Sequence, residues 1–284
     1  MAPLLACSCA VACGARGRPS IATTPRAIEW AQVWSDEFDG PAGQRIDTTR
    51  WSYDTGDGCQ RGICGWGNNE KEYYADSTQN IALNGRGQLQ IIARAAPAGL
   101  KCYYGPCRYT SAKITTRGKM LAAPGRVEAR IKLSSGQGLW PAFWMLGQGS
   151  PAIKWPDCGE IDIMENKGSQ PSTTSSALHG PGYFGATPFA SSHHLVSGNL
   201  SGDYHTFAVE WDSLSVRWYV DDVMHYAVTR EAILKYGPSV LNQPFFVILN
   251  LAVGGHFDGD PQSDAIFPAT MLVDYVRVYT AKTK

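Results

Sequence analysis

Hydrophobic and polar positions alternate in short runs along this chain from Trp30 onward. Gly, Pro, Asn and Asp separate the runs, and this pattern is typical of strands that bury one face. The clearest runs are residues 89–94, 126–133, 206–211, 216–220 and 272–279. Many such strands at close spacing predict an all-β sandwich or barrel.

Turn signals and one helical stretch complete the pattern. Asn84-Gly85 and Asp221-Asp222 stand where hairpin turns are expected. Only residues 230–236 look helical, and no repeat or linker interrupts the body, so residues 27–284 are expected to form a single domain. Residues 184–202 are polar and rich in Gly and Ser, fit no strand, and are expected to form a loop at a cleft edge.

The first residues differ from this body. Residues 1–15 (MAPLLACSCAVACGA) are apolar and rich in small residues, which predicts a secretory leader within residues 1–26 and a secreted protein. Lipid attachment at Cys7 or Cys13, or a disordered tail without a targeting role, are the alternatives. No later segment has the roughly eighteen apolar residues of a membrane span.

Five of the eight cysteines lie beyond the leader. Cys59 and Cys64 enclose four residues, as do Cys102 and Cys107. In an oxidising compartment each pair predicts a local disulfide. Four thiolates around zinc are the alternative, which this spacing disfavours. Cys158 is then left as a buried free thiol.

Composition narrows the class of ligand. The formal net charge is zero, so nothing favours nucleic acid or an anionic membrane as a partner. Nine Trp and thirteen Tyr suit an uncharged ligand with flat apolar faces, and a sugar ring is one such ligand.

Residues 155–166 (WPDCGEIDIMEN) carry three closely spaced carboxyls, Glu160, Asp162 and Glu165. On a regular strand Glu160 and Asp162 share a face, whereas Glu165 points the other way. A β-bulge at residues 163–164 would bring Glu165 to the same face. The two Glu side chains could then bring their carboxyls to about 5.5 Å, the separation found in retaining glycosidases.

This acidic cluster suits acid–base chemistry. Like charges this close raise at least one pKa, as a general acid near neutral pH requires. A solvated acidic edge strand and a calcium site are the alternatives, although calcium favours Asp-rich loops with Gly over an apolar alternating strand.

The segment 159–166 (GEIDIMEN) resembles the active-site signature of glycoside hydrolase family 16 in its bulged E-x-D-x-x-E form. Further stretches resemble family blocks in family order, namely residues 34–40, 66–74, 138–147, 245–255 and 273–279. Together they are most similar to the bacterial laminarinase-like branch. The resemblance implies a β-jelly-roll sandwich of two curved antiparallel sheets with a concave cleft.

The activity that the resemblance implies is retaining hydrolysis of internal β-1,3 bonds in laminarin-type β-glucans, by a protein expected to be a monomer. Mixed-linkage glucanase, galactanase and transglycosylase are the alternatives within the family, and a β-glucan-binding protein without activity is another. The inserted Met164 argues against the shorter E-x-D-x-E form of lichenases.

By matching position, the resemblance makes Glu160 the nucleophile, Glu165 the acid/base and Asp162 their assistant. It also puts Trp140 and Trp144, which share a strand face, on the cleft floor under the sugar rings, with core packing as the alternative for each. Further implied substrate contacts are Asn69, Arg94, Trp155 and His179; a turn residue, a surface charge, a packed ring and a locally satisfied histidine are the respective alternatives.

A metal is expected only in a structural role. The family often binds one calcium ion on the convex side, and the resemblance implies as ligands the carboxylate of Asp274 and the backbone oxygens of Glu37 and Gly87. A bare Asp at a strand start is the alternative, and no cofactor is expected for catalysis. His193 and His194 could bind a metal, but a solvated loop pair is the preferred interpretation.

Overall fold

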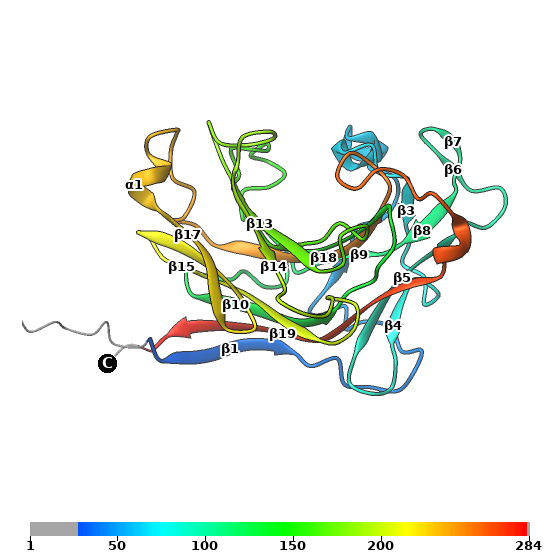
Figure 1. Ribbon diagram of the computed structural model, residues 1–284, viewed down its shortest axis with the longest axis horizontal. Helices are drawn as coiled ribbons and strands as arrows, with labels where there is room; N and C mark the ends of the chain where they lie inside the picture. Colours follow the sequence, from blue (N-terminus) through cyan, green and yellow to red (C-terminus); the bar gives the residue numbers. More distant parts are fainter. Residues whose placement is uncertain (1–27, 283–284) are drawn as a thin grey trace, which may run out of the picture.

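Two curved β-sheets lie face to face and bury their apolar side chains between them (Figure 1). The computed structural model describes residues 28–282. The predicted leader, with Cys7 and Cys13, therefore lies outside the described residues. No helix in the described part of the chain is long and apolar enough to cross a membrane.

The larger sheet has ten strands. In spatial order they are β17 (Val223–Thr229), β16 (Ser215–Val220), β15 (His205–Trp211), β10 (Arg126–Lys132), β19 (Ala269–Ala281), β5 (Leu89–Ala95), β8 (Tyr109–Ser111) and β3 (Glu72–Tyr74), with β1 (Trp30–Asp36) beside β19 and β4 (Ile81–Leu83) beside β5. All pairs are antiparallel except β3 with β8. The all-β prediction is confirmed.

The smaller sheet has seven strands. Their order is β14 (Phe189–His194), β13 (Thr173–His179), β12 (Glu160–Glu165), β11 (Leu139–Gly147), β18 (Phe245–Val253), β9 (Lys113–Thr115) and β2 (Ser52–Tyr53). The remaining elements are the β6 (Lys101–Cys102) and β7 (Gly105–Pro106) hairpin, α1 (Arg230–Ile233) and three 3-10 turns, η1 (Cys59–Arg61), η2 (Cys64–Gly67) and η3 (Asp264–Ile266).

Strand alternation builds the core from both sheets. Phe143 and Met145 of β11 and Ile161 of β12 belong to the core cluster, as do Val127 and Ile131 of β10 in the facing sheet. The intervening residues of the smaller sheet are directed to its other side. Several loops rise above that side in Figure 1.

The predicted turns and disulfides are present. Asp221 and Asp222 both have positive φ, as a tight hairpin turn requires, and they connect β16 to β17. Cys59 is bonded to Cys64 and Cys102 to Cys107. Cys158 is a buried free thiol, so the zinc alternative is wrong for these cysteines.

The expectation of an irregular loop over residues 184–202 is wrong in part. Strand β14 lies inside this segment and pairs with β13 along its whole length. Its residues alternate between half-buried and exposed positions. Because β14 is an edge strand with few large apolar residues, the alternation of apolar and polar types that identifies other strands is absent here.

Candidate active site

A β-bulge interrupts β12. Along β11, Met164 lies opposite Phe143 and Asp162 lies opposite Trp144, so Ile163 is an extra residue without a partner. The register of β12 with β13 shifts at the same place. The bulge predicted at residues 163–164 is therefore present.

The bulge places all three carboxyls on one face of the sheet. Glu160, Asp162 and Glu165 lie opposite Leu146, Trp144 and Ala142 of β11, respectively. These three partners occupy alternate positions of β11 and share the face opposite to its core residues. Without the extra residue, Glu165 would have pointed into the core.

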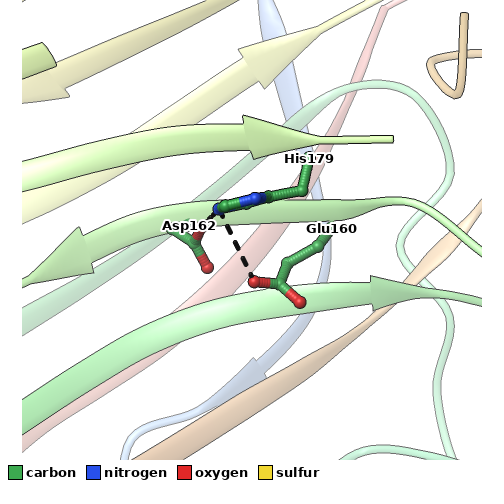
Figure 2. Close-up of side chains that lie close together, drawn as sticks. All are labelled: Glu160, Asp162 and His179. Atoms are coloured by element: carbon green, nitrogen blue, oxygen red, sulfur yellow. Dashed lines mark ion pairs between the residues drawn. The ribbon is translucent and has the colours of Figure 1, made fainter. Parts of the chain in front are cut away.

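His179 completes the cluster from β13, where it lies opposite Glu160. Its Nε2 is 3.1 Å from Asp162 Oδ2 and 3.9 Å from Glu160 Oε1. Figure 2 shows the ring directed at both carboxyls. Among the described residues, Asp162 Oδ2 and His179 Nδ1 have no hydrogen-bond partner, so the close contact between ring and carboxyl lacks hydrogen-bond alignment.

Burial raises the pKa of every carboxyl in the cluster, and repulsion by neighbouring carboxyls adds to the rise at Glu160 and Glu165. Burial first, and then the charge of Asp162, raise the pKa of Glu160 to about 8; a charged His179 and a hydrogen bond from the Trp155 side chain act in the opposite direction. Burial also raises the pKa of Asp162 to about 7. Burial and the charges of Asp162 and Glu160 raise the pKa of Glu165 well above its usual range. Protons are therefore retained here at neutral pH.

Trp140 forms a hydrogen bond to the carboxyl of Glu165. Its indole Nε1 donates to Glu165 Oε1 over 3.0 Å, and its ring stacks on Phe257 with 4.6 Å between ring centroids. Lys167 Nζ lies 4.9 Å from the Phe257 centroid. The sequence did not single out Phe257, because it comes from a loop more than a hundred residues away.

Trp144 rests on a buried polar network that the sequence did not reveal. Its indole Nε1 donates to Asn250 Oδ1 over 2.7 Å, Asn250 Nδ2 donates to the Tyr74 hydroxyl over 3.1 Å, and that hydroxyl donates to Glu70 over 3.2 Å. The ammonium of Lys113 lies 4.8 Å from the Trp144 ring centroid. These partners come from β18, β3 and β9 and fix the indole from beneath.

Trp155 lies on the opposite side of the acidic cluster from Trp144. Its ring centroid is 5.9 Å from that of His179 and 5.4 Å from that of Phe184. Trp155 and Phe184 are 46% and 43% exposed, so both rings are open to a ligand. Phe184 was not predicted, because it lies in the segment that was assigned to a loop.

The two predicted hydrogen-bonding residues lie apart from the cluster. Asn69 follows η2, and its Oδ1 accepts from Lys71 Nζ and from the Tyr103 hydroxyl, both over 2.8 Å. Arg94 lies on β5 of the larger sheet, out of phase with the core residues Leu89 and Ile91. Strand alternation therefore places Arg94 on the outer face of that sheet, away from the carboxyls.

The predicted calcium ligands come from neighbouring segments. Asp36, the end of β1, pairs with Val276 of β19, and Leu89 of β5 pairs with Val273, so the registers bring the chain at Glu37 and Gly87 close to Asp274. The donor set of one carboxylate and main-chain carbonyls suits calcium.

One neighbouring guanidinium group competes for the Asp274 carboxylate, and another holds the side chain of Glu37. Arg130 Nη1 lies 2.7 Å from Asp274 Oδ2, and Arg277 binds the Glu37 carboxylate. An ion there would have to displace Arg130 or use the other Asp274 oxygen. Within residues 28–282, the one group of three or more His, Cys, Asp and Glu side chains with converging ligand atoms is Glu160, Asp162 and His179.

Comparison with known proteins yields consistent matches. The profile of the family described as Glycosyl hydrolases family 16 matches residues 64–277. The chain is 38% identical over 275 residues to the Beta-glucanase of Rhodothermus marinus, covering 89% of this chain and 86% of that protein. It is 37% identical over 271 residues to the Glucan endo-1,3-beta-glucosidase A1 of Niallia circulans, covering 90% of this chain but only 39% of that longer protein.

A solved structure extends the likeness to three dimensions. The laminarinase catalytic domain from Thermotoga maritima MSB8 has a TM-score of 0.83 and 42% identity, covering 90% of this chain and all of that one. The likeness therefore holds for most of the chain.

Proposed function

The chain belongs to glycosyl hydrolases family 16, and from this premise we propose that it is a retaining endo-glycosidase that hydrolyses internal β-1,3 bonds of laminarin-type β-glucans. The observation that carries the proposal is the bulge in β12, which directs Glu160 and Glu165 to one face of the sheet. The proposed substrate is supported by relatives named as endo-1,3-beta-glucosidase, beta-glucanase and laminarinase.

The proposed reaction is a double displacement. A Glu160 carboxylate oxygen attacks the anomeric carbon while Glu165 gives its proton to the glycosidic oxygen, and the bond between that oxygen and the anomeric carbon breaks. In the second step Glu165 takes a proton from water, whose oxygen bonds to the anomeric carbon as the ester to Glu160 breaks. Two inversions give a product of retained configuration. The family needs no cofactor for this chemistry.

The surroundings of each carboxyl support these roles. Burial and two carboxyl neighbours raise the pKa of Glu165 well above its usual range, which keeps a proton on the acid. At Glu160 burial and Asp162 raise the pKa to about 8, and the His179 ring and the Trp155 side chain partly offset this rise and so favour the ionised form that a nucleophile requires. Asp162 lies between the two and within 3.1 Å of His179, where its charge assists the proton on Glu165.

The aromatic residues supply the binding surface in this proposal. Trp144, fixed from beneath by Asn250, and Trp155, nearly half exposed, present ring faces to the apolar faces of glucosyl units. Trp140 acts partly through its hydrogen bond to Glu165. Asn69 is proposed as a contact at the cleft rim. Arg94 is not part of the proposed site because of its position on the outer face of β5.

Chemical rescue tests the two roles separately. Glu160→Ala and Glu165→Ala are each expected to lose turnover of laminarin. With azide as the nucleophile, Glu160→Ala should form the α-glycosyl azide, because azide replaces the carboxylate in a single inversion. Glu165→Ala should form the β-azide, because azide enters at the second step. Swapped products would reverse the assignment, and full activity of either variant would refute it.

A structural calcium ion is a separate proposal. The Asp274 carboxylate and the carbonyl oxygens of Glu37 and Gly87 would hold it, and the ion would join the first and last strands to the hairpin of β4 and β5. Its role would be stability alone. Because Arg130 lies 2.7 Å from the Asp274 carboxylate, binding of calcium would require Arg130 to move away from that oxygen.

Compartment and assembly are two further proposals. Two disulfides support an oxidising compartment, and we propose that the protein is secreted and acts as a monomer. Gel filtration of the oxidised protein tests whether it is a monomer. Recovery of the protein from the culture medium tests whether it is secreted.

A further inference from the structure

Two large aromatic rings lie together on the surface beside the acidic cluster. Trp155, in the loop before β12, and Phe184, in the loop after β13, meet edge to face at an interplanar angle of 85°. Nearly half of each side chain is exposed. Paired exposed aromatic rings next to a catalytic group are typical of a ligand-binding surface.

The pair lies on the opposite flank of β12 from Trp144. Trp155 packs against His179 of β13, whereas Trp144 belongs to β11 and is bonded to Asn250 of β18. Because the strand order is β14-β13-β12-β11-β18, the two aromatic groups are separated by the strand that carries Glu160 and Glu165. A chain that crosses the strands would meet one group on each side of the reacting bond.

The surface between the pair and the sheet edge is lined by small side chains. On the face that carries the carboxyls, Ser175 of β13 lies opposite Ser192 of β14, and Ala177 lies opposite Ala190. These small side chains leave room for a sugar above them. The bulky side chains of β13 and β14 on this face are His179, which packs against Trp155, and His194 at the far end of β14.

The loop that carries Phe184 is held in place. Tyr183, directly before it, is fully buried and donates its hydroxyl hydrogen to the Pro238 carbonyl over 2.9 Å. Gly180 and Tyr183 exchange two backbone hydrogen bonds of 3.0 Å, and the Phe184 carbonyl accepts from Thr187 N over 3.1 Å. A ring held this way loses little conformational entropy when a ligand binds.

We propose that Trp155 and Phe184 form a second sugar-binding platform, which holds the glucan residues on the β13 side of the cut bond while Trp144 holds those on the β11 side. The inference rests on the proposed function and adds a specificity determinant, Phe184, to it. Binding on both flanks would make cleavage internal, because a chain end could occupy only one flank fully.

Mapping of cleavage positions tests the platform. Laminarihexaose labelled at its reducing end is digested, and the initial frequency of cut at each bond is measured. Loss of binding on one flank moves the cut so that more sugars occupy the other flank. Phe184→Ala and Trp144→Ala are therefore expected to shift the cut in opposite directions, each changing the ratio between cleavage at the second and at the fourth of the five bonds about 2- to 10-fold.

Matched variants separate binding from folding. Phe184→Tyr should keep the wild-type pattern, and Phe184→Leu should shift it as Phe184→Ala does. Leu214→Ala removes an exposed apolar side chain from the far sheet and should change nothing. A merely structural role for Phe184 would lower the rate at every bond equally.

Two results would overturn the inference: an unchanged pattern in Phe184→Ala, or a shift in the same direction as Trp144→Ala. A wild-type protein that leaves laminarihexaose uncut while cutting another β-glycan would instead refute the proposed substrate. In that case the mapping is repeated on oligosaccharides of that glycan, with the same opposite shifts expected.

Discussion

Replacement of Glu160 by Gln removes one ionisable group from a crowded acidic cluster and keeps the shape of the side chain. The carboxyl has an ordinary pKa of 4.5, and burial and the charge of Asp162 raise it to about 8 in the folded protein. The folded state therefore holds this proton to a higher pH than the unfolded state does. Between these two values the stability of the wild type falls as pH rises.

The magnitude follows from the difference between the two pKa values. Each pKa unit corresponds to about 1.4 kcal/mol, so complete ionisation of Glu160 costs the folded state up to about 5 kcal/mol. The neighbouring Asp162 shares part of this cost, since the two groups titrate together. We expect Glu160→Gln to be about 2 kcal/mol more stable than the wild type at about pH 8, with little difference near the ordinary pKa of 4.5.

Urea unfolding of the oxidised protein at several pH values measures this gain. Glu231→Gln makes the same chemical change on an exposed turn of α1 and serves as the control, with no gain that grows with pH. The variant should also be inactive, so the cluster would reduce stability in order to provide reactivity. A gain of equal size at all pH values, or a less stable variant at alkaline pH, would refute the reasoning.

Three further outcomes follow from the same contacts. His179→Gln removes the positive charge that lowers the pKa of Glu160, so the acid limb of the kcat/KM profile should move up by about 0.5–1 pH unit; an unmoved limb would contradict the assignment. Asn250→Ala leaves the Trp144 indole without its acceptor and should raise KM for laminarin about tenfold with a smaller change in kcat, corresponding to about 1.4 kcal/mol; a loss confined to kcat would argue against a binding role. Calcium should raise the Tm of the chelator-treated wild type but not that of Asp274→Asn, and an equal rise in both would place the ion elsewhere.

Local sequence was sufficient to predict the acidic strand. Glu160, Asp162 and Glu165 lie on one strand, and the odd spacing of Glu165 required the bulge that the register of β11 with β12 shows. The disulfide between Cys59 and Cys64 was predictable for the same reason, since only four residues lie between the two cysteines. In each case the partners are close in the chain, so that no knowledge of the topology was needed.

Topology decided the residues that sequence reasoning misplaced or missed. Arg94 is on a well-predicted strand, but its face could not be assigned without knowing which side of β5 is buried. Phe257, Lys113 and Tyr74 reach the site through strand order, which sequence periodicity does not contain. The polar edge strand β14 gave no alternating signal at all.

The two flanks of β12 have different architectures, and this difference bears on how the site could select its substrate. Trp144 is fixed by side chains of β18, β3 and β9 that are buried in the sandwich, so a change there perturbs the fold together with binding. Phe184 sits on a loop held by the buried Tyr183 and by backbone hydrogen bonds, and its own side chain is nearly half exposed and contacts only the Trp155 ring among the aromatic residues. Substitution at Phe184 should therefore cost little stability. Substitutions on the β13 flank can therefore change which glycan binds at little cost in stability. Substitutions on the β11 flank or at the carboxyls of β12 would disturb the fold or the reaction itself.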